Sequence, residues 1–465
     1  MKKILLIVHD NYQQDNYFPL GPAYIASYLR ENGHDITTYC MDVFHYTNEE
    51  LAIFLDKHSF DYIGVGFLAG RFNETIIDLC KVINEHKKDA KIVVGGHGPS
   101  PIPRYMIRKL NIDFVIIGEG EETFLEIVND VPLKKIAGVA FKLNNDIIVN
   151  PRRKPIHNLD TLPFPAWDLF PIEKYINAVK WPGWKEGDKT FCILTSRGCI
   201  NACTFCYRIE KGIRVRSIPN IIDEIKALHS IYGINYFLIQ DECFILSEQR
   251  LRSFVDAIIN LPFKIKYYCD SRVEVFSNNI AGMLKGSGCQ FVNFGFESMS
   301  QRVLDNIKKN TTIEQNIRAA KIAKKNNLPM GLNFIWNMPG DTFESLTENV
   351  DFLMMHNTYV QLRTIKPATP YPGCELYYWA ILNGRLEGPE DFFARFKNLD
   401  LITVNLTDLN LDEMYNALYQ ANGNLIIDHY RNTTCNYDEA KNIINQFKRL
   451  YFEGETKFRG ARHYG

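Results

Sequence analysis

Three cysteines stand close together in the segment SRGCINACTFCYR, residues 196–208. These are Cys199, Cys203 and Cys206. A disulfide would use two of the thiols and leave the third unexplained, while a structural zinc ion usually takes four protein ligands. A four-iron, four-sulfur cluster held by three thiolates keeps one iron open for an exogenous ligand. The spacing therefore favours an iron–sulfur cluster, with a zinc site completed by His229 or Cys243 as the alternative.

The composition is that of an ordinary globular chain, since 46% of its 465 residues are hydrophobic and 23% are charged. Lys and Arg number 53 against 54 Asp and Glu, so a net charge of −1 gives no overall field to attract nucleic acid or an anionic membrane surface. The apolar run in MKKILLIVHD is too short for a signal peptide, and no apolar run reaches the roughly eighteen residues of a membrane span. We therefore expect a cytoplasmic protein without nucleic-acid or membrane partners.

The first part of the chain alternates short apolar runs with helical patterns, which is typical of a parallel sheet covered on both faces. The predicted strands are 3–8, 36–39, 62–67, 91–94 and 114–117. We expect a Rossmann-like, doubly wound domain over residues 1–150 that binds its ligand beyond the carboxyl ends of the strands. Those ends are the segments 10–21, 66–71, 95–98 and 118–120. Three of them are rich in glycine, so backbone can approach a large flat ligand, although glycine also simply ends strands.

A second βα series begins near residue 190, after a hairpin over 131–157 with its turn at 144–146 and an ordered linker within 151–188. Its predicted strands are 191–196, 236–239, 266–269, 291–294, 330–334 and 361–365. Six βα units form a second open sheet or a partial barrel over residues 189–384. The cysteine segment follows the first of these strands, where such folds place their chemistry. Residues 385–465 are predicted to form a helical cap.

The spacing C-x3-C-x2-C, with Phe205 before the last cysteine, resembles the cluster motif of the radical S-adenosylmethionine (SAM) superfamily. Further stretches resemble one branch of it, which joins a cobalamin-binding domain to a radical SAM barrel. These stretches are FPLGPAYIASYLRENGHDI, GGHGPSP, GEGEETF, LPFPAWDL, YFLIQDECF, SRVEVFSNNIAGMLKGSGCQFVNFGFES, NMPGDT and PYPGCELY. The branch includes class B methyltransferases and relatives of the anaerobic magnesium-protoporphyrin monomethyl ester cyclase. The resemblance covers residues 1 to about 380.

The resemblance implies a 4Fe–4S cluster on the three cysteines, with SAM bound to the open iron and cleaved to a 5′-deoxyadenosyl radical. Residues placed to contact SAM are Tyr207, Asp241, Arg272, Glu297 and Asn333. Arg272 would pair with the SAM carboxylate through its fork of donors, and Glu297 with the amino or ribose groups. The superfamily's Gly-Gly-Glu after the second strand is replaced by Gln240-Asp241-Glu242, so the contact to the methionyl group differs.

Cobalamin is the third cofactor that the resemblance implies, at the glycine-rich ends of the first sheet. The loop residues concerned are Gly95, Gly96, His97, Gly118 and Gly120. The Asp-x-His-x-x-Gly motif, whose histidine binds cobalt in many cobalamin domains, does not occur here. The resembling branch commonly lacks it too, and His97 is expected to pack or to form hydrogen bonds.

The resulting interpretation is a cobalamin-dependent methyltransferase acting on an unactivated carbon of a small metabolite, with a flavodoxin- or ferredoxin-like electron donor. The alternative is a radical SAM enzyme for rearrangement, cyclisation or oxidation, whose N-terminal domain binds cobalamin for another role or not at all. Neither the substrate nor a catalytic residue can be read from the sequence.

Replacing one of the three cysteines tests the cluster directly. Purified anaerobically, the chain should be brown and hold about four irons, as one 4Fe–4S cluster requires. Cys203→Ala should lose most of this iron together with SAM cleavage, because a required thiolate ligand is gone. Stoichiometric zinc without iron in the unmodified chain would contradict the cluster assignment.

Overall fold

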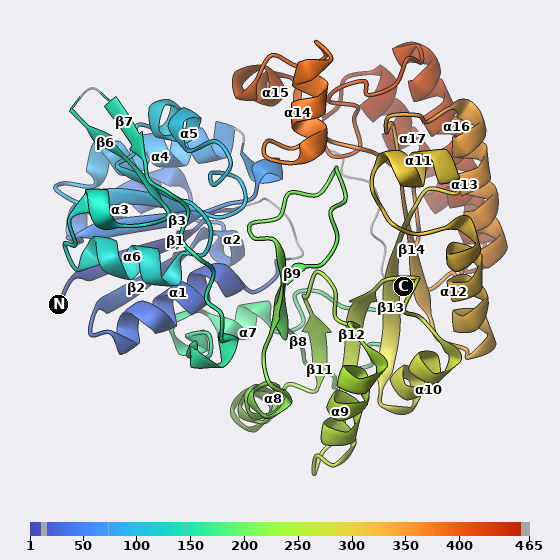
Figure 1. Ribbon diagram of the computed structural model, residues 1–465, viewed down its shortest axis with the longest axis horizontal. Coiled ribbons are helices and arrows are strands. Elements are labelled where there is room, and N and C mark those ends of the chain that lie inside the picture. Colours follow the sequence, from blue (N-terminus) through green and yellow to red (C-terminus); the bar gives the residue numbers. More distant parts are fainter. Residues whose placement is uncertain (11–15, 73, 145, 457–465) are drawn as a thin grey trace. The chain divides into compact units, whose positions relative to one another are not determined.

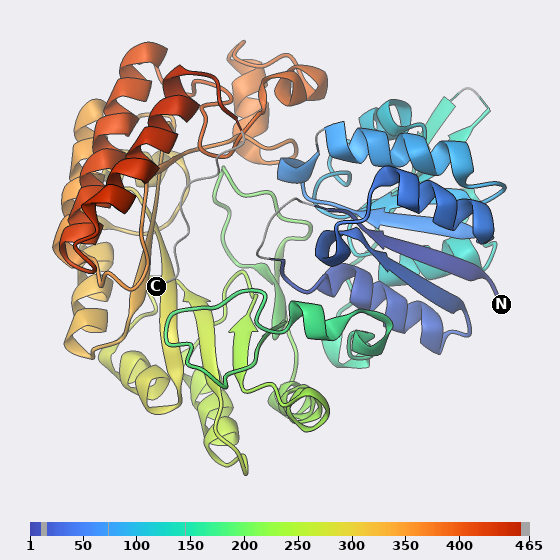
Figure 2. The ribbon, with the colours of Figure 1, turned by 180° about the vertical axis from the view of Figure 1, so that it is seen from behind.

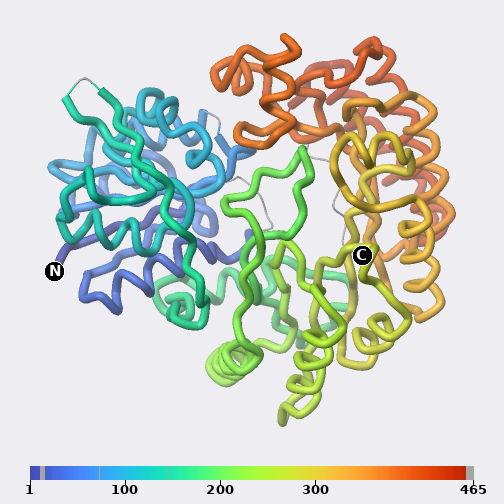
Figure 3. Tube along the Cα trace, viewed as in Figure 1, coloured from blue at the N-terminus to red at the C-terminus, as the bar shows by residue number. Residues whose placement is uncertain are grey.

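A computed structural model describes residues 1–10, 16–72, 74–144 and 146–456. Parts of four predicted segments lie outside these residues: the strand end at 10–21, the start of a helix at Asn73, the turn position Asn145 and the final residues 457–465. The chain packs into two units. Figure 3 traces the chain by residue number from blue to red, so that the segments of each unit can be followed. The first comprises residues 1–179, 189–193 and 207–228, and the second 180–188, 194–206 and 229–465. The four-part division at 150, 188 and 384 stays a prediction.

The first unit contains the predicted parallel sheet. Its strands are β1 (Lys3–Val8), β2 (Asp35–Cys40), β3 (Tyr62–Gly66), β4 (Lys91–Gly95), β5 (Phe114–Ile116), β6 (Val139–Leu143) and β7 (Asp146–Val149). They follow the order β2-β1-β3-β4-β5-β6-β7, with β1 to β5 parallel. The residues Ile4 to Ile7 of β1 are all buried, because this strand has a neighbour on each side and a helical layer on each face. The doubly wound fold is therefore confirmed.

Helices cover both faces of this sheet, as Figure 1 shows. α1 and α6 pack together on one face, and α3, α4 and α5 follow one another on the other. The helices of the unit are α1 (Leu20–Glu31), α2 (Met41–Phe44), α3 (Asn48–Lys57), α4 (Glu74–His86), α5 (Pro103–Leu110), α6 (Glu121–Val128), α7 (Ile172–Tyr175) and most of α8 (Ile218–Tyr232). Short 3-10 turns occur at Ala69–Arg71, Leu133–Lys135, Leu159–Thr161 and Trp167–Leu169, and the strands β8 (Thr190–Ile193) and β10 (Gly212–Val215) complete the unit.

The predicted hairpin is β6–β7, and it extends the sheet from five strands to seven. β6 pairs antiparallel with β5, so that Phe141 stands opposite Phe114. Both rings are buried. An apolar strand edge that is left unpaired invites association with other chains, and the hairpin covers that edge.

The proline- and aromatic-rich segment 159–175 is ordered within the first unit. Ala166 N–H donates to the Ala23 carbonyl of α1 at 3.1 Å, and Arg30 pairs with Asp168 at 2.6 Å. Phe170 packs edge-to-face on Phe18 at 5.3 Å between ring centres. Proline and buried aromatic side chains thus hold this segment in place, rather than leaving it a loose tether.

The second unit carries the curled sheet of the βα series. The strands of this unit are β9 (Ser196–Cys199), which lies outside the curled sheet, and β11 (Tyr236–Ile239), β12 (Lys266–Ser271), β13 (Cys289–Glu297), β14 (Met330–Trp336) and β15 (Lys366–Pro367), which belong to it. β11 to β15 pair in parallel in chain order. Figure 1 shows α9, α10, α12 and α13 along one side of these strands, the arrangement of a partial barrel. The helices are α9 (Glu248–Ile259), α10 (Asn278–Gly286), α11 (Gln301–Asn306), α12 (Ile313–Lys325), α13 (Phe343–His356), α14 (Glu375–Leu382), α15 (Pro389–Arg395), α16 (Leu411–Arg431) and α17 (Tyr437–Phe452).

The last predicted strand, 361–365, is wrong in position, because β15 occupies only Lys366–Pro367. The reason lies on α16, where the buried Asn422 side chain binds this backbone. Its Oδ1 accepts from Ile365 N at 2.8 Å and its Nδ2 donates to Ile365 O at 3.1 Å. A side-chain amide thus takes the bonds that a neighbouring strand would otherwise supply.

The C-terminal region is helical, and part of it covers strand ends as expected. Figure 2 shows the long helices α16 and α17 side by side, and α16 also packs on α13. The irregular segment before α16 reaches the end of β14, where Asn337 donates to Val404 O at 2.9 Å and accepts from Leu406 N at 3.0 Å. Lys366 of β15 pairs with Asp400 at 3.3 Å.

Removing the Asn422 amide should destabilise the chain. Asn422→Ala leaves the N–H and C=O of Ile365 buried without these partners, which costs about 1–3 kcal/mol per group. Urea unfolding measures the loss, with Asn416→Ala on the exposed face of the same helix as the matched control. Equal stability of the two variants would contradict the role of Asn422.

Candidate functional site

The cysteine segment forms the end of β9 and the loop that follows. Cys203 is buried, Cys199 is partly exposed and Cys206 is exposed, and all three are free thiols. Cys206 is exposed as a residue, but nearby protein atoms desolvate its thiol and raise the pKa of Cys206, and the neighbouring thiols of Cys203 and Cys199 add to this effect. The three sulfurs therefore lie within one another's electrostatic reach. Three thiols on one loop match, in number and in type, the ligands of a 4Fe–4S cluster with one open iron.

Backbone hydrogen bonds anchor this loop to two distant segments of the same unit. Thr204 N–H donates to Ile307 O at 3.0 Å, and Leu376 N–H donates to Thr204 O at 2.8 Å. Gly198 has a φ of +87°, which suits glycine and lets β9 turn into the loop. The cysteines are thus held by contacts made more than a hundred residues away in sequence.

Neither suggested fourth zinc ligand joins the three cysteines. Cys243 is buried near Cys199, but its S–H donates to Ile245 O at 3.6 Å. His229 stacks on Phe263 and hydrogen-bonds to Ile234 O at 2.9 Å. Among the described residues, no group of three or more His, Cys, Asp and Glu side chains is gathered around a metal-ion position.

Asp241, expected near SAM, is bound by the chain itself. It is 2% exposed, and its carboxylate accepts from Thr195 N at 2.6 Å, from Ser196 Oγ at 2.7 Å and from Thr195 Oγ. Burial raises the pKa of Asp241, and these hydrogen bonds oppose the rise. The carboxylate holds the start of β9, three residues before Cys199, while a contact to SAM stays a prediction.

Glu297 ends β13 in a left-handed conformation, with a φ of +65°. Its Oε1 accepts from Lys309 Nζ at 2.7 Å, and both residues are only 8% exposed. At Gly295 a β-carbon would approach Lys309 Nζ to 2.9 Å, so the missing side chain makes room for the ion pair. The pairing register between β13 and β14 shifts between Gly295 and Glu297. The Glu297 side chain therefore does not follow the regular alternation of side chains between the two faces of the sheet.

Lys309 is the residue that the sequence analysis missed. Burial lowers the pKa of its ammonium, but Glu297 and Cys203 outweigh burial, so the pKa lies above its ordinary value. In return, Lys309 opposes the rise that burial causes in the pKa of Cys203. The sequence shows two adjacent lysines, Lys308 and Lys309, and nothing in it indicates that Lys308 is exposed while Lys309 is buried.

Arg272, directly after β12, is a partly buried cation with 11% of its side chain exposed. Its Nη2 pairs with Glu274, whereas its Nε and Nη1 have no hydrogen-bond partner among the described residues. Its charge also opposes the rise in the pKa of Cys203. Buried donors without a partner are unfavourable unless a ligand completes them. A carboxylate-bearing ligand such as SAM fits this guanidinium.

Asn333 belongs to a polar network on the partial barrel. Its Oδ1 accepts from Arg363 Nη1 at 2.7 Å, and Arg363 Nη2 donates to Asn293 Oδ1 at 3.1 Å. Asn293 in turn donates to Asp270 at 2.8 Å, as does Tyr268 at 2.7 Å. Burial raises the pKa of Asp270 to about 6.

In the first unit, the glycines of the 95–98 loop are required by packing. A β-carbon at Gly96 or Gly98 would approach atoms of Phe67 to 2.9 Å. His97 lies edge-to-face on Tyr207 at 6.0 Å, and burial lowers the pKa of His97, which favours the neutral ring. Gly95 and Gly96 keep partial exposure, so backbone is presented at the end of β4, as a flat ligand requires.

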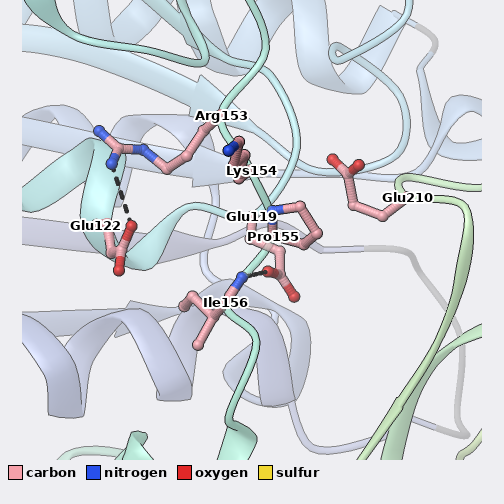
Figure 4. Close-up of a pocket in the computed structure, with 7 residues that line it drawn as sticks. All are labelled: Glu119, Glu122, Arg153, Lys154, Pro155, Ile156 and Glu210. Atoms are coloured by element: carbon pink, nitrogen blue, oxygen red, sulfur yellow. Dashed lines mark hydrogen bonds and ion pairs between the residues drawn. The ribbon is translucent and has the colours of Figure 1, made fainter.

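The 118–120 loop is fixed by Glu119, another residue not anticipated. Its carboxylate accepts from Arg214 Nη1 at 2.9 and 2.8 Å and from Ile156 N at 2.8 Å. Figure 4 shows Glu119 in a small pocket beside Arg153 and Glu122. Its empty space of about 210 Å³ is below the roughly 300–1,000 Å³ of ordinary ligand pockets.

No histidine in the described residues supplies the missing cobalt-binding motif. One Asp-x-His triplet exists, at Asp56–His58, without the following glycine. His58 caps α3 in an exposed position, where its ring hydrogen-bonds to Phe54 O at 2.8 Å.

Comparison with known proteins identifies the families of two stretches of the chain. Residues 11–128 match the B12 binding domain, and residues 193–353 match the radical SAM superfamily. An uncharacterized methyltransferase (PH0819) of Pyrococcus horikoshii is 34% identical over 378 residues, which span 79% of each chain. The chain belongs to the B12-binding radical SAM family. The predicted family, fold class and cofactors (a 4Fe–4S cluster, SAM and cobalamin) are therefore confirmed.

Two further relatives of this radical SAM chain extend the comparison. The anaerobic magnesium-protoporphyrin IX monomethyl ester cyclase of Rubrivivax gelatinosus is 24% identical over 396 residues, covering 80% of this chain and 69% of the cyclase. The structure of the radical SAM methyltransferase TsrM from Kitasatospora setae superposes with a TM-score of 0.66 at 17% identity, covering 82% of this chain and 76% of TsrM. That superposition shows a shared fold. No described helix is long and apolar enough to cross a membrane.

Removing the Asp241 carboxylate should loosen the cysteine loop. Asp241→Ala leaves buried donors of Thr195 and Ser196 without this acceptor, so we expect a loss of about 1–3 kcal/mol in unfolding free energy and reduced iron retention. Urea unfolding and iron analysis after gel filtration measure both effects. Asp256→Ala, on an exposed position of α9, is the control. Retention of iron equal to that of the control would contradict the positioning role.

Proposed function

We propose that this chain transfers a methyl group to an unactivated carbon of a small metabolite. The observation that carries the proposal is the alignment with a methyltransferase across both domains, at 34% identity. The cyclase relative, at 24% identity, supports the alternative of radical chemistry without methylation more weakly.

Cys199, Cys203 and Cys206 are the proposed cluster ligands. Support comes from their neighbouring thiols and from the loop bonds that fix Thr204 between two segments of the second unit. When bound, the cluster supplies the electron that cleaves SAM, and cobalamin carries the methyl group. The chain's own task at this loop is to hold three cysteine ligands through the backbone bonds of Thr204.

Arg272 and Glu297 are the proposed contacts to SAM. The guanidinium of Arg272 has two donor nitrogens for the SAM carboxylate. Glu297 engages Lys309 through Oε1, which leaves Oε2 for the amino or ribose groups. Asp241 is proposed to position this site indirectly, because it holds the start of β9. Tyr207 is proposed to pack along the adenine of SAM.

The polar network of Asp270, Asn293, Asn333 and Arg363 is the proposed substrate side of the barrel. Its side chains offer carboxylate, amide and guanidinium groups within hydrogen-bonding distance of one another. That mixture suits a small polar metabolite better than an apolar one.

Cobalamin is proposed to lie over the loops that contain Gly95, Gly96, His97, Gly118 and Gly120, held by backbone and shape without a protein ligand to cobalt. A neutral His97 agrees with a packing role. We further propose a cytoplasmic location, a flavodoxin- or ferredoxin-like donor, and an organisation with boundaries near 150, 188 and 384.

Product analysis tests the function. Reconstituted anaerobically with iron, sulfide and cobalamin and given a reductant, the chain should convert SAM into both S-adenosylhomocysteine and 5′-deoxyadenosine. Chromatography with mass detection measures the two products. Formation of 5′-deoxyadenosine alone would reject methyl transfer and favour the alternative, whereas Cys203→Ala should give neither product.

A further inference from the structure

Lys309 is a buried lysine in a tight turn. The turn joins α11 to α12, and the residues on either side, Lys308 and Asn310, have left-handed φ values of +53° and +58°. Lys309 N–H donates to Leu304 O at 3.0 Å, and the residue is only 8% exposed. Lysine is almost never buried to this degree without a partner, so its placement needs a reason beyond packing.

The same turn is attached to the cysteine loop. Ile307, two residues before Lys309, accepts a hydrogen bond from the backbone of Thr204 at 3.0 Å. Thr204 directly follows Cys203. The Lys309 charge opposes the rise in the pKa of both the Cys203 and the Cys206 thiol, so the ammonium lies within electrostatic range of this loop.

Glu297 supplies the opposing charge from β13, with 2.7 Å between its Oε1 and Lys309 Nζ. Glycine at 295 provides the space that both side chains occupy. The pair is neutral overall, and its two members act on the pKa of Cys203 in opposite directions. A change in either residue would therefore change the local charge by one unit in a medium that screens poorly.

We propose that Lys309 and Glu297 together set the reduction potential of the iron–sulfur cluster, with Lys309 favouring the reduced cluster and Glu297 opposing it. The inference rests on the proposed cluster ligands. Reduction adds one electron, delivered by an external donor of the flavodoxin or ferredoxin class, and forms or breaks no bond. Net charge near the sulfurs is one of the factors that sets such potentials.

An anaerobic redox titration followed by electron paramagnetic resonance tests this in the full-length, reconstituted chain without SAM. At the potential where half of the wild-type clusters are reduced, Lys309→Met should lower the ratio of reduced to oxidised cluster about tenfold, or about 59 mV for one electron. Glu297→Gln should raise the ratio, and the double variant should fall between the two. Lys309→Arg keeps the charge and should stay near wild type.

Lys308→Met is the matched control, because Lys308 is the exposed neighbour that pairs with Glu375 outside the buried pair. It should leave the potential unchanged. Wild-type potentials in Lys309→Met and Glu297→Gln, with clusters intact, would overturn the inference. If Lys309→Met holds no cluster, Glu297→Gln decides: a raised potential supports the proposal and an unchanged one rejects it. Absence of iron from the wild-type chain would instead reject the proposed cluster itself.

Discussion

Compensation of negative charge at the cysteine loop is the constraint on which the second unit depends. Thiolates and carboxylates are unfavourable away from water unless cations or donors accompany them. Two cations serve here, the buried Lys309 and the partly buried Arg272, and both oppose the rise in the pKa of Cys203. Each is paired with a glutamate, Glu297 and Glu274, so the region carries charge without a large net excess. Positions far apart in sequence are needed to build this arrangement.

The parallel strands explain how those positions come together. Asp241 follows β11, Arg272 follows β12, Glu297 ends β13 and Asn337 follows β14. Carboxyl ends of parallel strands share one edge, so polar residues there converge. Their tasks nevertheless differ. Asp241 and Asn337 are saturated by the chain's own groups and hold backbone, whereas Arg272 retains donors for a ligand.

The edge of the first sheet follows a different rule. Close packing of the 95–98 loop on Phe67 leaves no room for side chains at Gly96 and Gly98. The 118–120 loop is fixed by Glu119 and Arg214, two charged residues almost a hundred positions apart. Loops held by close packing and by an ion pair, with backbone partly exposed, suit the match of this domain to the B12 binding domain.

The sequence by itself determined the local and repetitive features: the five parallel strands of the first sheet, the βα series of the second, the three thiols and the family. These follow from hydrophobic period and residue spacing, which act over a few residues. Tertiary structure alone decided which polar residues face the thiols. Lys309 and Lys308 are neighbours of one type, yet Lys309 is buried in an ion pair with Glu297 and Lys308 is exposed. The strand predicted at 361–365 was displaced because Asn422, on a distant helix, binds its backbone. Burial and pairing depend on contacts across long sequence separations, and no local pattern encodes them.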